Sequence, residues 1–136
     1  MGSGTARRRA TPRVDYETLA DLRYHIRRFL RVREEAARAA GVEPQQYVVL
    51  LQVKGFERRR PATIGALTER LQVRHHATVQ LVDRLSRRGL VRRRRAELDR
   101  RGVVVELTPR GEAVLRKLRS IRWPSSAREA LRWRPR

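Results

Sequence analysis

Polar and basic side chains that could bind an anion fall into two clusters along the sequence. The first follows a predicted turn at residues 72–74, and the second lies at and beyond the end of a predicted strand at residues 90–94. Guanidinium groups donate paired N–H bonds to carboxylates, phosphates and base edges, while imidazole, hydroxyl and amide groups add single hydrogen bonds. The clusters consist of Arg74, His75, His76, Thr78, Gln80 and Arg84, and of Arg94, Arg95, Asp99, Arg100 and Arg101.

The sequence does not indicate catalysis or metal binding. It holds no cysteine, and its three histidines are His25, His75 and His76. Adjacent helical residues point about 100° apart, so His75 and His76 cannot easily face one ion, and a zinc site usually needs three or four ligands. No nucleophile and base pair, glycine-rich phosphate loop or paired carboxylates stand at a meaningful spacing. We therefore expect neither an enzyme nor a bound metal or other cofactor.

The charge balance predicts a polyanionic partner. The sequence contains 34 Lys+Arg against 14 Asp+Glu, which gives a net charge of +20 at neutral pH. Nucleic acid, an anionic membrane face or an acidic protein would each complement this charge, and charge alone does not choose among them. No apolar run has the length of a signal-peptide core or a membrane span, so we expect a cytoplasmic protein without membrane contact.

Hydrophobic periodicity predicts one helical domain, residues 14–136, after a basic arm. Residues 1–13 carry no periodic apolar positions, so we expect a flexible arm, of which the first four residues have the composition of a cloning tag. Apolar residues then recur at threes and fours from Leu19 to Ala40, which predicts one long helix over 14–40. Pro44 favours the start of a second helix that runs to about Lys54.

The next elements form a helix-turn-helix followed by a hairpin. Thr63 can cap a short helix to residue 71, and a tight turn leads to a helix over 75–88 that Gly89 ends. Alternating strands at 90–94 and 103–107 flank a charged tip, and Thr108 with Pro109 favours a last helix. The fold class is therefore mainly α with a small antiparallel β hairpin: a winged helix-turn-helix with a long N-terminal dimerisation helix. Its expected inward residues include Ile64, Leu67, Leu71, Val79, Val82 and Leu85.

Three stretches of the sequence resemble the MarR family of winged helix-turn-helix transcriptional regulators. They are TIGALTERLQV from Thr63, TVQLVDRLSRRGLVRR from Thr78 and DRRGVVVELTPRGE from Asp99. The last matches the family's wing, in which Asp, any residue and Arg precede an alternating strand that ends in Leu-Thr. The resemblance covers residues 14–122 and implies a dimeric repressor or activator with a ligand pocket between its dimer helices and its DNA-binding lobe. The chain departs from the family at Glu43, where a capping Thr is common, and in having only 12 residues after Pro124.

A helix-turn-helix places its second helix in the major groove with the amino end first, so the first cluster is the predicted base and phosphate contact of helix 75–88. The wing at 95–102 would place Arg101 in the minor groove, with Asp99 holding it in position. Asp83 is expected to organise neighbouring arginines. Each interpretation has an alternative. The residues at the start of helix 75–88 could be exposed cap residues, the wing arginines could form a solvated charged strand edge, and Asp83 and Arg84 could form surface ion pairs.

A helix over 14–40 would be about 40 Å long, which is too long for so small a lobe to cover. We therefore expect a homodimer in which residues 14–43 and 109–136 supply the dimerisation helices and residues 44–108 the DNA-binding lobe. The alternative is a monomer whose last helix covers the first. Aromatic residues could line an effector pocket or belong to the core, so no ligand-binding residue is assigned: they are Tyr24, Tyr47, Trp123 and Trp133.

The function expected from these features is a DNA-binding transcriptional regulator, a ligand-responsive repressor, that binds a pseudopalindromic operator in double-stranded DNA. The alternative is an architectural or protein-interaction winged helix that binds nucleic acid by charge and without sequence preference. The two differ in whether random duplex competes as well as a specific site at physiological salt.

Overall fold

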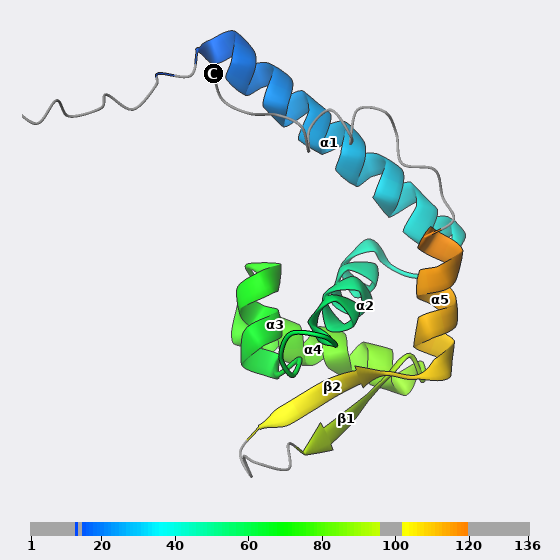
Figure 1. The fold of residues 1–136 in the computed structure, drawn as a ribbon. Coiled ribbons are helices and arrows are strands. Elements are labelled where there is room, and N and C mark those ends of the chain that lie inside the picture. Colours follow the sequence, from blue (N-terminus) through cyan, green and yellow to red (C-terminus); the bar gives the residue numbers. More distant parts are fainter. Residues whose placement is uncertain (1–12, 14, 96–101, 120–136) are drawn as a thin grey trace, which may run out of the picture. The chain divides into compact units, whose positions relative to one another are not determined.

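The structure is a computed structural model, and it describes residues 13, 15–95 and 102–119. These residues form five helices and a two-stranded hairpin (Figure 1). These described residues divide between two compact units, one with residues 13 and 15–31 and the other with residues 32–95 and 102–119, and each is described separately. The elements are α1 (Tyr16–Ala39), α2 (Pro44–Phe56), α3 (Ile64–Leu71), α4 (His75–Arg87), β1 (Val91–Arg95), β2 (Val103–Leu107) and α5 (Pro109–Arg119).

The first unit contains the amino-terminal part of α1, which confirms the predicted long helix. Asp15 precedes the helix, and its Oδ1 atom accepts a hydrogen bond of 2.7 Å from the backbone N–H of Thr18. That hydrogen bond to the backbone N–H, together with one from the Thr18 side chain, lowers the pKa of Asp15, because both stabilise the ionised carboxylate. Several large apolar side chains of this part of the helix are exposed: Tyr16, Leu19, Tyr24, Ile26 and Leu30.

The second unit is built around an apolar core to which α2, α3, α4, the hairpin and α5 all contribute. Leu50, Leu67, Leu85 and Leu118 are at most 1% exposed, and they come from the four helices. Burying a leucine side chain stabilises a fold by about 1.5–3 kcal/mol relative to leaving it exposed. The core therefore fixes the mutual arrangement of the helices that carry the predicted contact residues.

The helix-turn-helix forms as its local signals predict. Thr63 caps α3, since its Oγ1 atom accepts a hydrogen bond of 3.1 Å from the backbone N–H of Ala66. Gln72 ends α3 in the left-handed conformation with φ 55°, and Arg74 stands at the N-cap of α4 in extended backbone. The inward face of α4 differs from the prediction, because Thr78 and Leu81 are buried whereas Val79 is only half-buried.

The two strands pair antiparallel, with Val91 opposite Leu107 and Arg95 opposite Val103. On its other side β2 meets the segment before α3, where the backbone N–H of Val105 donates to the carbonyl of Ala62 at 2.9 Å. Strand alternation divides the hairpin into two faces. Val91, Arg93 and Val105 share the face toward α4, and Arg92, Arg94, Val104 and Glu106 share the outer face.

The start of α5 confirms the predicted Thr108–Pro109 signal. The Thr108 Oγ1 atom accepts a hydrogen bond of 3.2 Å from the backbone N–H of Gly111, and its hydroxyl donates to the carbonyl of Gly89. Gly111 lies against the backbone before β1, and a Cβ atom there would come within 2.1 Å of the Leu90 carbonyl oxygen. The predicted arm, the hairpin tip and the chain beyond Arg119 lie outside the described residues, and the domain boundaries stay a prediction.

Candidate nucleic-acid interface

The first turn of α4 presents a polar, basic surface to solvent. Arg74, His75, His76 and Gln80 are all exposed, as a contact surface requires. Arg74 stands at the N-cap position without using its side chain as a cap. The N–H groups of a helix's first turn lack intrahelical acceptors, and the helix dipole is positive at that end. This end of α4 is therefore suited to hold an anion such as a phosphate.

Thr78 is a correction to the sequence-based site. Its side chain is fully buried between α3 and α4, where the Thr68 and Thr78 hydroxyl oxygens lie 2.8 Å apart in a hydrogen bond. Thr78 lies one helical turn before Val82, which is on the same buried face of α4. Thr78 thus joins the two helices of the helix-turn-helix and cannot reach a ligand with its side chain.

Asp83 and Arg84 lie further along α4 and differ in their surroundings. Asp83 accepts a hydrogen bond from the Arg93 guanidinium, so it organises an arginine of β1 as the sequence predicted. This ion pair joins the helix to the hairpin. Arg84 is exposed and lines a hollow of about 360 Å³ together with Arg38, Gln46 and Leu81.

The arginines of β1 are less uniform than a run of solvated charges. Glu106 of β2 accepts hydrogen bonds from the Nε atoms of Arg92 at 3.0 Å and Arg94 at 2.6 Å. The hydrogen bond from Arg94, followed by that from Arg92, lowers the pKa of Glu106 against the opposing effect of burial. Arg95 is exposed at the strand end. Asp99, Arg100 and Arg101 lie outside the described residues, and their contacts with DNA stay a prediction.

Arg88, directly after α4, is a residue that the sequence reasoning missed. Its guanidinium donates to Gln46 Oε1 at 2.7 Å and to the Gly41 carbonyl at 2.6 Å. Charge-assisted hydrogen bonds of this kind are stronger than neutral ones. They tie the carboxyl end of α4 to the turn before α2. Because the partners are 42 and 47 residues away in sequence, no local pattern pointed to this contact.

Within the described residues, no group of three or more His, Asp or Glu side chains is arranged to hold a metal ion. The helices in that same part of the chain are also too short or too polar to cross a membrane.

The described fold is a winged helix-turn-helix, defined by the α3–turn–α4 pair, the β1–β2 wing and the flanking helices. The sequence model described as the MarR family matches residues 40–102. This matched stretch contains α2, α3, α4 and β1, and over it the chain is similar to the MarR family. No curated protein sequence matches the chain.

Solved structures of MarR and of a MarR family regulator have a similar fold. Apo MarR from E. coli is 22% identical, with 90% of this chain and 86% of that chain covered and a TM-score of 0.70. A MarR family transcription regulator is 27% identical over 85% of this chain and 73% of its own, with a TM-score of 0.66. A mutant of E. coli MarR complexed with operator DNA is 22% identical over 86% of this chain and 81% of its own, with a TM-score of 0.67.

Proposed function

We propose that this chain is a DNA-binding transcription regulator that inserts the amino end of α4 into the major groove and the wing into the adjacent minor groove. The observation that carries the proposal is the exposed first turn of α4, where Arg74, His75, His76 and Gln80 surround the positive end of the helix. The Asp83–Arg93 ion pair holds the wing strand to that helix. The E. coli MarR mutant solved with operator DNA supports this arrangement by its similar fold.

The regulator acts as a homodimer that binds a pseudopalindromic operator in the cytoplasm. The support is the row of exposed apolar side chains on α1, for which a second copy of the chain is the proposed cover. A two-fold dimer would present two copies of α4 to half-sites about one turn of DNA apart, roughly 34–36 Å. We further propose that a small-molecule effector releases the DNA, so that the protein is a ligand-responsive repressor.

Fluorescence anisotropy with the promoter of the protein's own operon and a random duplex of equal length tests the proposal at physiological salt. We expect the promoter duplex to bind at least about 1,000-fold more tightly, as specific regulators do. Equal affinity for both duplexes would overturn specific regulation. It would favour the second candidate, a charge-driven architectural protein, for which the net charge of +20 is the supporting observation.

Gln80→Ala tests the orientation of α4 in the groove. An amide that reads a base edge contributes about 1–3 kcal/mol of discrimination, so this variant should lose about 10-fold or more of its preference for the promoter. Gln45→Ala is the matched control, because Gln45 is exposed in the first turn of α2 and lies outside the first turn of α4. If both variants keep the wild-type preference, Gln80 does not read a base.

A further inference from the structure

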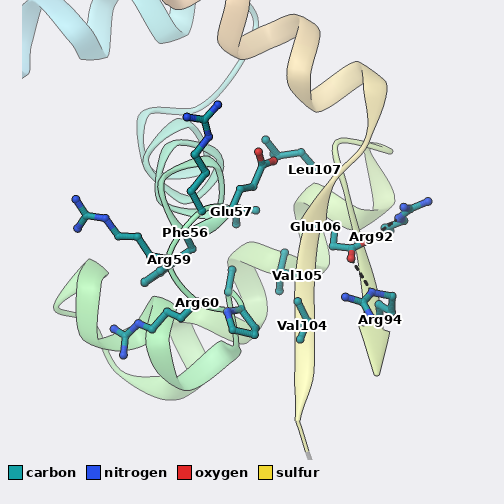
Figure 2. A pocket seen from close by; sticks show the side chains of 14 residues that line it. Phe56, Glu57, Arg59, Arg60, Arg92, Arg94, Val104, Val105, Glu106 and Leu107 are labelled. Atoms are coloured by element: carbon teal, nitrogen blue, oxygen red, sulfur yellow. Dashed lines mark hydrogen bonds and ion pairs between the residues drawn. The ribbon is translucent and has the colours of Figure 1, made fainter. Parts of the chain in front are cut away.

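The outer face of the wing and the α2–α3 loop enclose a hollow that shares only Arg94 with the predicted DNA contacts. Its volume is about 610 Å³, which is within the range of roughly 300–1,000 Å³ that is typical of small-molecule sites. Figure 2 shows the loop residues Arg59 and Arg60 on one side and the strand residues Arg92 and Arg94 on the other. Arg93, which pairs with α4, points to the opposite face of the sheet.

The floor of this hollow is apolar. Phe56 from the end of α2 and Val104 from the outer face of β2 line it, and each is 5% exposed because it also packs against the interior. The Arg60 guanidinium lies over the Phe56 ring, 5.0 Å from its centroid. An apolar surface at the base of an open hollow favours an occupant with an apolar body.

The rim of the hollow carries more positive charge than its own carboxylates neutralise. Arg92 and Arg94 share the single carboxylate of Glu106 through their Nε atoms, so their terminal N–H groups keep donor capacity. The other carboxylate, Glu57, pairs with Lys54 at 2.9 Å. Arg58 and Arg59 form no ion pair within the part of the chain that the structure describes. The uncompensated charge therefore favours an anion.

We propose that this hollow binds a small organic anion that has an apolar body. The carboxylate or phosphate of such a molecule would engage the guanidinium groups of the rim, and its body would cover the floor formed by Phe56 and Val104. Planar guanidinium groups suit this chemistry because they bind carboxylates and phosphates through two parallel N–H bonds. An occupant would also contact Arg92 and Arg94 on the strand whose Arg93 pairs with α4. The inference that such an occupant would change the affinity for duplex DNA rests on the proposed function.

Isothermal titration calorimetry on the full chain tests the site with four probes at one ionic strength. Phenylacetate carries both the charge and the apolar body, phenylacetamide lacks the charge, acetate lacks the body, and phenyl phosphate replaces the carboxylate. We expect phenylacetate or phenyl phosphate to bind one site with a dissociation constant below about 1 mM, and at least about 10-fold more tightly than phenylacetamide or acetate. If acetate binds as well as phenylacetate, or if neither aromatic anion binds, the proposal is overturned.

The double variant R58Q/R59Q locates the binding. Neither arginine forms an ion pair with a described residue, so the substitutions leave no carboxylate without a partner there. We expect its affinity for the aromatic anion to fall about 10-fold. The double variant R116Q/R119Q makes the same charge change on the exposed face of α5 and should keep wild-type affinity. An equal loss of anion affinity in both variants would show that the binding is only general attraction by a basic protein, which would overturn the site. Circular dichroism checks that both variants remain folded.

Duplex titrations of the same variants separate this proposal from the proposed function. We expect R58Q/R59Q without any probe to bind the promoter duplex within about twofold of R116Q/R119Q. A specific loss of duplex affinity in R58Q/R59Q, with unchanged probe binding, would assign the loop to DNA phosphates and overturn the anion site. If the chain shows no promoter preference, the calorimetric result stands by itself.

Discussion

Glu106 faces two arginines of the neighbouring strand, and this arrangement decides how much of the wing's charge is available to a partner. Arg92 lies directly opposite Glu106 in the strand register, and Arg94 lies two residues along the same face. Opposite charges that face each other across a strand pair contribute roughly 0.2–1 kcal/mol. The arginine run is therefore partly a paired strand surface, and not only the solvated charged edge of the alternative interpretation, and it is partly available for binding.

Glu106→Gln should lower the free energy of unfolding by about 1 kcal/mol at neutral pH, because the ion pairs are partly exposed and screened by solvent. The folded-state pKa of Glu106 is lowered, chiefly by the hydrogen bond from Arg94. The stabilisation that ionised Glu106 provides is thus complete above the pKa that Glu106 has in the unfolded chain. It is lost as the pH falls through the lower pKa that Glu106 has in the folded protein. Urea unfolding of both proteins at pH 7 and pH 3 checks this. A difference that stays constant between the two pH values would contradict the ion-pair explanation.

At the scale of elements, contacts between backbones decide how α5 meets the wing. α5 begins directly after β2 (Figure 1). The Thr108 hydroxyl holds the start of α5 to the carbonyl of Gly89. Lys54 of α2 also donates to Glu112 of α5 at 2.8 Å, and that hydrogen bond, followed by the one to Glu57, raises the pKa of the lysine. Gly111 is the closest point of this junction, because its missing side chain allows the helix to approach Leu90.

Gly111→Ala should destabilise the protein by about 1–3 kcal/mol or more. The new methyl group would overlap the backbone carbonyl of Leu90 and would also come within 3.3 Å of the packed Leu107 side chain. Gly55→Ala is the matched control, because a Cβ atom at Gly55 meets nothing within 4 Å and alanine favours the helix. Thermal unfolding followed by circular dichroism measures both. Equal melting temperatures of the two variants would show that α5 shifts freely away from β1.

At the scale of the whole molecule, the net charge of +20 and the apolar surface of α1 have separate consequences. The charge attracts any polyanion and weakens with salt, so it does not by itself give sequence preference. The apolar side chains of α1 are instead the proposed dimer surface. The two properties can be tested independently because they involve different residues.

Ile26→Glu should convert a dimer to a monomer, because it places a charge among exposed apolar side chains that a second copy would otherwise bury. Arg28→Gln is the matched control, because it changes the net charge by the same amount. Arg28 lies two positions after Ile26, about 200° round the helix, and therefore on another face. Analytical ultracentrifugation at micromolar concentration compares them with the wild-type chain. If Ile26→Glu sediments as the wild-type chain does, this face of α1 does not form the dimer.

The sequence by itself determined the order and type of the elements, because their signals are local. The caps at Thr63 and Thr108 and the glycine at Gly89 act within a few residues, and the structure confirms each of them. The apolar pattern of β2 also predicted a strand at the right residues, although both Val104 and Val105 are buried, so the burial does not alternate. The resemblance to the MarR family was also readable from the sequence, since the wing pattern and the helix-turn-helix are contiguous stretches, and the family model matches residues 40–102. The burial of Thr78 was missed, although its place on the same helical face as Val82 is a local signal that could have shown it.

Only the tertiary structure decided which charged side chains are paired and which remain for a ligand. The contacts of Arg88 with Gln46 and Gly41, of Arg93 with Asp83, and the sharing of Glu106 depend on how elements pack and on strand register. The same packing forms the hollow between the α2–α3 loop and the outer face of the wing. Such contacts join residues that are 10 to 47 positions apart, so no local pattern of hydrophobicity or capping encodes them.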